Sequence, residues 1–178
     1  MYVKIEYRSK EIFELDYKAE IYAQAEAMIQ EHLWWNEPLT LYEQIEYPEH
    51  LTGDSKLLYE WIPDEMGPRR YVEPQDDALL AMRDYAEILK VLGALSEEHD
   101  FSWVLFYRGV GPDIKVIGRI ESGVVDHDAL QFLSDTLKCH EISDAMFQDE
   151  ELAKLTYHKY FNAEDQPIFP DDEDSESF

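Results

Sequence analysis

Three stretches of this chain alternate apolar and polar side chains, and a stretch of helical periodicity follows each of them. A period of two places every second side chain on one face of a strand. A short polar or glycine-containing link divides each stretch, which is typical of a β-hairpin. Three hairpins of this kind predict an antiparallel sheet. Its strands are expected over 3–7 and 13–17, over 39–45 and 56–62, and over 101–107 and 114–120.

Three local features are expected inside these hairpins. Residues 48–55 contain Pro48 and Gly53 and should form a loop. Both faces of the strand over 101–107 are apolar, so this strand should lie in the middle of the sheet, covered on both sides. Gly118 should mark a bulge or a close approach of another element.

Helical periodicity fills the segments between the hairpins. Apolar residues recur at steps of three and four from Lys18 to Trp35, and again from Asp76 to about Gly93. Further helices are expected after Asp126 or Asp128 and from Ser143 to 160, because these residues are good N-caps. The predicted class is α+β, an antiparallel sheet built from β-hairpins with helices packed on one face, in the approximate order ββα-ββα-ββαα.

One domain is expected over residues 1–162. Residues 63–75 are rich in Pro and Gly, so any internal boundary, or a functional loop, is expected there. Residues 163–178 contain the run Asp171-Asp172-Glu173-Asp174-Ser175-Glu176, which predicts an acidic, flexible tail.

The charge balance limits the partners that this chain can have. It has 40 Asp and Glu residues against 15 Lys and Arg, a net charge of −25. Affinity for nucleic acid comes largely from Lys and Arg side chains that displace counterions from the phosphates. Direct binding to nucleic acid is therefore not expected. Anionic lipid is repelled for the same reason, and no membrane contact is expected. The field attracts basic proteins, which are the predicted class of partner.

The partner-binding residues are predicted on an acidic helix near the C-terminal end. Carboxylates along a helix can imitate a line of phosphates, although an ordinary solvated helix face has the same composition. The adjacent Trp34 and Trp35 are a second candidate, because an exposed indole often anchors an interface; packing in the core is the alternative. The predicted acidic residues are Glu141, Asp144, Asp149, Glu150 and Glu151.

An alternative site combines Asp126, His127 and Asp128 with His140. Imidazole and carboxylate ligands could hold a divalent cation that activates a water, as in metal-dependent hydrolases. Helix capping explains the same acids without a metal. No Gly-x-Ser-x-Gly, His-Glu-x-x-His or phosphate-binding lysine motif is present, so no catalytic residue and no cofactor is predicted.

Cys139 is the only cysteine, so no internal disulfide forms, and a reducing cytoplasm is the expected location. The leading hypothesis is a non-enzymatic, acidic inhibitor that occupies a basic surface of its partner in a 1:1 or 2:2 complex. It would be an immunity or antidote protein, or a nucleic-acid mimic that blocks a nuclease or a DNA-binding defence protein. The alternatives are a structural or adaptor module, in which charge serves solubility only, and a small metal-dependent hydrolase.

Overall fold

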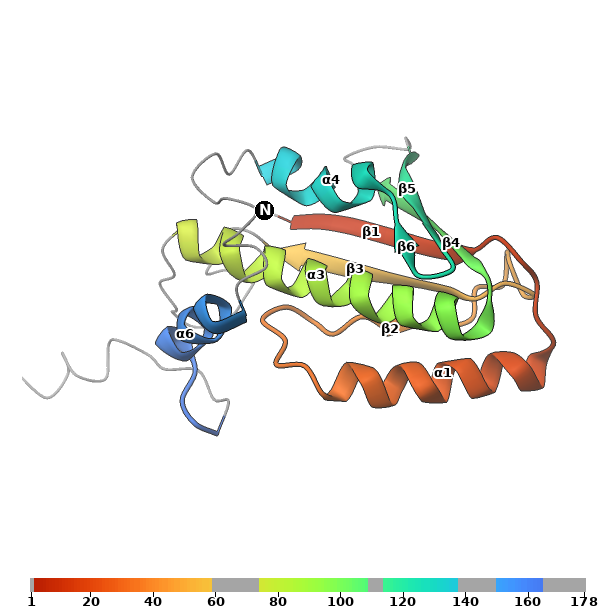
Figure 1. The fold of residues 1–178 in the computed structure, drawn as a ribbon, viewed down its shortest axis with the longest axis horizontal. Coiled ribbons are helices and arrows are strands. Elements are labelled where there is room, and N and C mark those ends of the chain that lie inside the picture. The colour runs from red at the N-terminus through yellow and green to blue at the C-terminus, as the bar shows by residue number, and fades with distance from the viewer. Residues whose placement is uncertain (1, 59–73, 109–113, 138–149, 165–178) are drawn as a thin grey trace, which may run out of the picture.

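The computed structural model describes residues 2–58, 74–108, 114–137 and 150–164. Within them the strands form one antiparallel sheet in the order β2-β3-β1-β4-β5-β6, and helices cover one of its faces (Figure 1). The predicted α+β class is confirmed. The elements are β1 (Tyr2–Ser9), α1 (Leu15–Gln30), β2 (Thr40–Leu41), β3 (Thr52–Leu58), α3 (Pro74–His99), β4 (Ser102–Arg108), β5 (Ile114–Glu121), β6 (Val124–Val125), α4 (His127–Leu137) and α6 (Glu150–Tyr160).

Buried and half-buried side chains alternate along β1 and so define the two faces of the sheet. Val3, Ile5 and Tyr7 are at most 2% exposed, whereas Lys4, Glu6 and Arg8 between them are only half-buried. β1 lies in the centre, paired with β3 on one side and with β4 on the other. The inward side chains therefore meet the helices, while the even-numbered ones form a face that no described helix covers.

The long helix α3 contributes more buried residues to the core than any other described element. Two aspartates in its first turn, Asp76 and Asp77, favour its start because they complement the helix dipole. It continues through Gly93 to His99, six residues beyond the predicted end. The fully buried Trp103 of β4 donates its indole N–H to the carbonyl of Leu92, 2.9 Å away, and so joins helix and sheet.

The second strand of the first predicted hairpin, over 13–17, is wrong. The chain passes from β1 through a short coil into α1, which begins at Leu15. Phe13 packs on Phe101 of the core, and Tyr17, which is 38% exposed, packs on His99. Their apparent period of two arises from one coil residue and the first helical turn. Helical periodicity and four alanines decide the structure of this segment.

The boundaries of the second hairpin also differ from the prediction. β2 is limited to Thr40–Leu41, and β3 begins at Thr52, inside the predicted loop of 48–55. Gly53 makes the early start of β3 possible. A Cβ atom there would lie 2.4 Å from a ring carbon of Tyr7 and 2.2 Å from the Thr40 carbonyl oxygen. Close packing of three strands, rather than a turn, accounts for this glycine.

β4 is central, as predicted, but in the described residues it is covered on one face only. Val104 and Phe106 on its other face are half-buried. The predicted irregularity near Gly118 is confirmed: the register of β4 and β5 shifts between Leu105 and Phe106, and a Cβ at Gly118 would lie 3.0 Å from Ala129 of α4.

The C-terminal elements add a smaller second cluster. Tyr157 and Phe161 stack with ring centroids 4.3 Å apart and pack with Leu80 of α3 and Trp35. The end of α6 agrees with the predicted helix end. The predicted boundary over 63–75 and the tail over 163–178 lie mostly outside the described residues and stay predictions. No described helix has the length and apolarity that a membrane crossing requires.

Asp84 of α3 fastens the segment after α1 to the core. Its carboxylate is fully buried and accepts hydrogen bonds from the backbone N–H groups of Trp35 and Asn36, at 3.1 and 2.8 Å. It also accepts one from the Asn36 amide at 3.0 Å and lies 3.1 Å from Nε2 of His32. A buried charge with this many donors is stabilising only while all of them remain.

Replacing Asp84 with Ala should therefore lower the free energy of unfolding by about 3 kcal/mol, since buried donors lose a charged acceptor. Asp84→Asn, which keeps one acceptor oxygen, should lie between this variant and the native chain. Urea denaturation measures both. Asp135→Ala on the exposed side of α4 is the control and should change stability by less than about 0.5 kcal/mol. Equal losses for Asp84→Ala and Asp135→Ala would contradict the assignment.

Two buried tyrosines make the fold sensitive to alkali. Burial raises the pKa of Tyr7 and of Tyr85 far above the ordinary value of 10.0, so both stay neutral in the folded chain. A raised pKa contributes stability below pH 10 that is lost as pH rises further, because only the unfolded chain then ionises. Above pH 10 each tyrosine should remove about 1.4 kcal/mol of unfolding free energy per pH unit. Urea denaturation at several pH values above 10 gives the dependence of the unfolding free energy on pH. This dependence should be weaker in Tyr7→Phe than in the native chain; an unchanged dependence contradicts the account.

Candidate functional site

Most of the predicted acidic helix lies outside the residues that the structure describes. Glu141, Asp144 and Asp149 lie outside the described residues. Glu150 begins α6, and Glu151 is exposed, with its carboxylate 3.9 Å from Nζ of Lys154. The proposed binding role of this helix therefore stays a prediction.

Both tryptophans make internal contacts. Trp35 is 8% exposed and packs against Phe161 and Tyr160. Trp34 is half-buried, stacks edge-on against His32 and donates its indole N–H to the carbonyl of Ile29 at 2.8 Å. Trp35 thus packs against residues at the end of α6, and Trp34 packs beside the last turn of α1.

The residues of the alternative metal site do not converge in the described part of the chain. Asp126 precedes α4, and its carboxylate accepts the backbone N–H of Arg119 at 2.9 Å. His127 and Asp128 are exposed, and His140 lies outside the described residues. Among the residues that the structure describes, no group of three His, Cys, Asp or Glu side chains could hold a metal ion.

A different group of exposed carboxylates is concentrated in one segment of the described chain. Between positions 11 and 49 there are ten acids, and all ten are exposed. The same segment has one Lys or Arg, Lys18, and that residue is buried. We call these ten carboxylates, with those at the end of α3, the acidic surface. Its members are Glu11, Glu14, Asp16, Glu20, Glu26, Glu31, Glu37, Glu43, Glu46, Glu49, Glu97, Glu98 and Asp100.

The geometry of α1 explains why its acids point outward. Lys18, Ile21 and Ala25 are the buried residues, and they follow one another at steps of three and four on one side of the helix. Asp16 and Glu20 occupy the opposite side, one turn apart, at a rise of about 6 Å.

The buried ammonium of Lys18 connects α1 to the segment that follows β2. Nζ donates a hydrogen bond to the carbonyl oxygen of Pro48 at 2.8 Å and lies 3.3 Å from Oε1 of Glu43. The lysine side chain is 1% exposed. Lys18 thus adds no positive charge to the surface, and it holds the acidic segment 43–49 against the helix.

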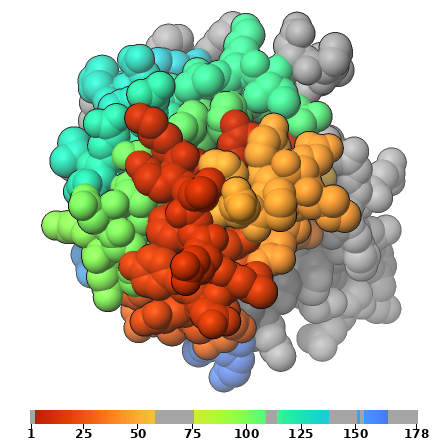
Figure 2. All heavy atoms as spheres, turned by 90° about the vertical axis from the view of Figure 1, so that its right-hand side faces the viewer, coloured from red at the N-terminus to blue at the C-terminus, as the bar shows by residue number. Residues whose placement is uncertain are grey.

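The end of α3 continues the acidic surface. His99 lies between Tyr17 and Gln24 of α1, 2.7 Å from the hydroxyl of one and from the amide oxygen of the other. Gln24 also donates to Glu98. Seen from the end of the molecule where α1 begins, the red atoms at the start of α1 lie between the orange atoms of the 42–52 segment and the light green atoms at the end of α3 (Figure 2).

The face of the sheet that no described helix covers carries both signs of charge; we call it the open face. Among the described residues it presents five Lys and Arg side chains, and Asp54 and Glu6 on the same face lie 3.4 Å from Lys4 and 3.0 Å from Arg108. Across three strands, Lys4 stands directly opposite Lys56 on one side and Arg108 on the other. A parallel row, four residues further along β1, places Arg8 beside Val104 and Val104 beside Arg119. The five bases are Lys4, Arg8, Lys56, Arg108 and Arg119.

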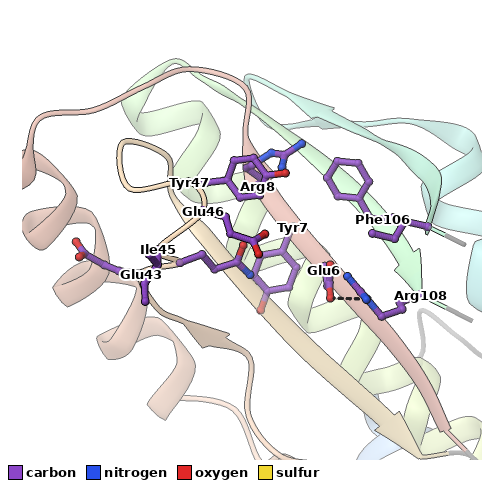
Figure 3. Close-up of a pocket in the computed structure, with 11 residues that line it drawn as sticks. Glu6, Tyr7, Arg8, Glu43, Ile45, Glu46, Tyr47, Phe106 and Arg108 are labelled. Atoms are coloured by element: carbon purple, nitrogen blue, oxygen red, sulfur yellow. Dashed lines mark hydrogen bonds and ion pairs between the residues drawn. The ribbon is translucent and has the colours of Figure 1, made fainter. Parts of the chain in front are cut away.

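A groove of about 510 Å³ runs between the open face and the 43–47 segment (Figure 3). Its floor includes Arg8 and Phe106, and Ile45 on its wall is 97% exposed. The guanidinium of Arg8 lies 4.0 Å from the ring centre of Tyr47 and 5.1 Å from that of Phe106. Both aromatic rings therefore lie within the range of a cation–π interaction with this guanidinium.

Comparison with known proteins gives no further guide to the function. No protein-family model, no curated protein and no solved structure matches the chain. Function is therefore inferred from the charges and contacts of the chain itself.

The acidic surface had a signal in the sequence that the prediction overlooked. The first sixty residues contain five bases, and four of them, Lys4, Arg8, Lys10 and Lys56, lie outside the segment 11–50. The net charge of the whole chain does not reveal this contrast. That Lys18 is buried, and that the other bases share a face, depends on tertiary structure.

Lys18→Met should loosen the 43–49 segment while leaving global stability within about 1 kcal/mol, because methionine fills a similar volume and the Glu43 carboxylate, which is 53% exposed, stays solvated by water. The measurement is amide hydrogen exchange at Phe13, whose N–H donates to the carbonyl of Glu49 at 2.8 Å. Exchange there should become at least about tenfold faster, as expected for a local opening that has lost its anchor. The Trp103 amide in the central strand is the control. Unchanged exchange at Phe13 would show that Lys18 does not hold this segment.

Proposed function

We propose that this chain is a non-enzymatic binding protein that places its acidic surface against a basic surface of a partner protein and so blocks it. One observation carries the proposal: between positions 11 and 49 every exposed Asp, Glu, Lys or Arg is an acid, and the only base is buried and bonded internally. A surface of one sign attracts and orients a partner of the other sign.

The position of these acids argues against a purely structural role. Glu31 stands at the C-cap of α1, and Glu97 and Glu98 lie in the last turn of α3. The C-terminal end of a helix carries partial negative charge, so each acid there costs about 0.3–1 kcal/mol where a base would be favourable. Charge that serves solubility alone could be placed without this loss and without segregation from the bases. The segregation therefore favours recognition.

The chemistry of the partner follows from the surface. Carboxylates spaced at about 6 Å along a helix offer a partner the same kind of contact as a row of phosphates. A protein whose basic surface normally binds nucleic acid meets these requirements. The function proposed for this chain is that of an immunity or antidote protein, or of a nucleic-acid mimic, directed against a nuclease or a DNA-binding protein.

The test uses a variant of the acidic surface, Glu20→Gln, Glu26→Gln and Glu31→Gln combined. The native chain should capture a basic protein from host lysate at about 0.05 M salt and release it at about 0.5 M, where charges are screened within a few ångströms. The triple variant should bind the captured protein about tenfold or more weakly, since several charged contacts are lost. Binding is measured by titration calorimetry with the purified captured protein.

A matched control removes three negative charges elsewhere, through Glu121→Gln, Asp135→Asn and Glu164→Gln, all at exposed positions. This control should bind as the native chain does. Equal weakening in both triple variants would mean that only net charge matters. Capture of no basic protein at low salt would overturn the proposal altogether.

A further inference from the structure

The exposed apolar side chains of this molecule gather in the same segment as its exposed acids. Twelve large apolar side chains are exposed in the described residues, and seven of them lie between positions 11 and 49, although this segment is less than a third of the described chain. Ile12, Leu15 and Ile45 are 62%, 68% and 97% exposed. Charge that serves solubility gains nothing from apolar neighbours, whereas a protein interface obtains most of its affinity from a few apolar anchors.

Two of these seven side chains, Ile45 and Tyr47, meet further apolar groups in the groove at the open face (Figure 3). Phe106 of β4 and Ile114 of β5 line the same groove. Val116, which is 62% exposed, is the partner of Phe106 on β5. Apolar side chains from two distant parts of the chain therefore line one hollow at the surface, which is the form of a binding site for an apolar group.

The charges around the groove favour a basic occupant over an acidic one. Glu43 and Glu46 line the groove and belong to the acidic surface, and Glu46 has no ion pair among the described residues. Arg8 lies against two aromatic rings, and Arg108 is paired with Glu6 at 3.0 Å. An anion in the groove would meet these carboxylates, whereas a Lys or Arg side chain can pair with Glu46. The occupant is therefore expected to carry a base next to its apolar group.

We propose that the groove receives a large apolar side chain of the basic partner protein, and that a Lys or Arg beside this side chain pairs with Glu46. This inference rests on the function proposed above and names the anchor of that same interface. Because Glu43 and Glu46 belong both to the acidic surface and to the groove, a partner that binds the acidic surface meets the groove within the same contact area. The acids attract and orient the partner, and the apolar contact slows its release.

The part of the groove that carries Ile45 is held in place before any partner binds. The ammonium of Lys18 donates a hydrogen bond to the carbonyl of Pro48 at 2.8 Å. The ring centre of Tyr47 lies 4.0 Å from the guanidinium carbon of Arg8. A segment fixed at both of these points loses little conformational freedom on binding, which favours affinity.

The experiment measures how Ile45→Ser changes the affinity for the basic protein that the native chain captures. Ile45 is 97% exposed, so its replacement keeps the fold and the charge. Titration calorimetry should give about tenfold weaker binding at about 0.05 M and at about 0.2 M NaCl, since salt does not screen an apolar contact. The matched control is Leu155→Ser on α6, where the leucine is 67% exposed, and it should bind as the native chain does. Native affinity of Ile45→Ser at both salt concentrations would overturn the inference.

The triple variant Glu20→Gln, Glu26→Gln and Glu31→Gln separates this inference from the proposed function. Its loss of affinity should become smaller as salt rises, because the contacts that it removes are between charges. If the triple variant binds weakly and Ile45→Ser binds normally, the groove is not the anchor and the proposed function stands. If no basic protein is captured at low salt, the proposed function fails and the anchor fails with it.

Methyl spectra locate the contact without any substitution. In a full-length chain whose isoleucine δ1-methyl groups are isotope-labelled, the signals of Ile45 and Ile114 should shift when the captured protein is added. Those of Ile21 and Ile120, which are fully buried, should keep their positions. Unshifted signals of Ile45 and Ile114 in the saturated complex would overturn the proposal.

Discussion

The burial of the Lys18 ammonium is the constraint on which the surface of this molecule depends. Its hydrogen bond to the Pro48 carbonyl and its ion pair with Glu43 hold α1 and the 43–49 segment together. A lysine of ordinary exposure at this position would place a positive charge in the middle of ten carboxylates. Because the charge is satisfied inside, these carboxylates form a field of one sign.

Sheet geometry places different charged groups on the two sides of the molecule. On β1 the odd residues enter the core and the even residues, Lys4, Glu6 and Arg8, face away from the helices. The acids of α1 and of the end of α3 lie on the helix side, and the row from Lys56 to Arg108 lies on the open face. The net charge of −25 is a sum over the whole chain and does not give the charge of either side of the sheet. Recognition by charge depends on the local field, and between positions 11 and 49 that field comes from ten exposed acids with no exposed Lys or Arg among them.

Much of the fold could be predicted from the sequence, because period two and period 3.6 are local properties. The strands near 3–7, 101–107 and 114–120 were predicted to within two residues, and the helices near 18–35 and 76–93 with errors of up to six residues at their ends. The second strand at 13–17 was wrong because Phe13 and Tyr17 are apolar for tertiary reasons: they pack on Phe101 and His99. Gly53 predicted a loop, yet the glycine is needed where Tyr7 and β2 crowd β3.

The candidate site was harder to predict than the fold. Composition pointed to a basic partner, but the charge pattern alone favoured the helix of 141–151 over the segment 11–49. Only the structure shows that Lys18 is internal, that Asp84 holds Trp35 and Asn36 close to α3, and that Lys4, Lys56 and Arg108 share one row. These facts join residues that are distant in sequence, and no local pattern contains them.

The most direct test of the acidic surface as the binding surface is carboxyl footprinting of the complex with the captured basic partner. A carbodiimide and an amine label exposed carboxylates, and mass spectrometry compares their rates in the free and bound chain. Strong protection of Glu20, Glu26 and Glu98, with unchanged labelling of Asp135 and Glu164, is the predicted result. Protection of Asp135 and Glu164 with none on α1 would contradict the account.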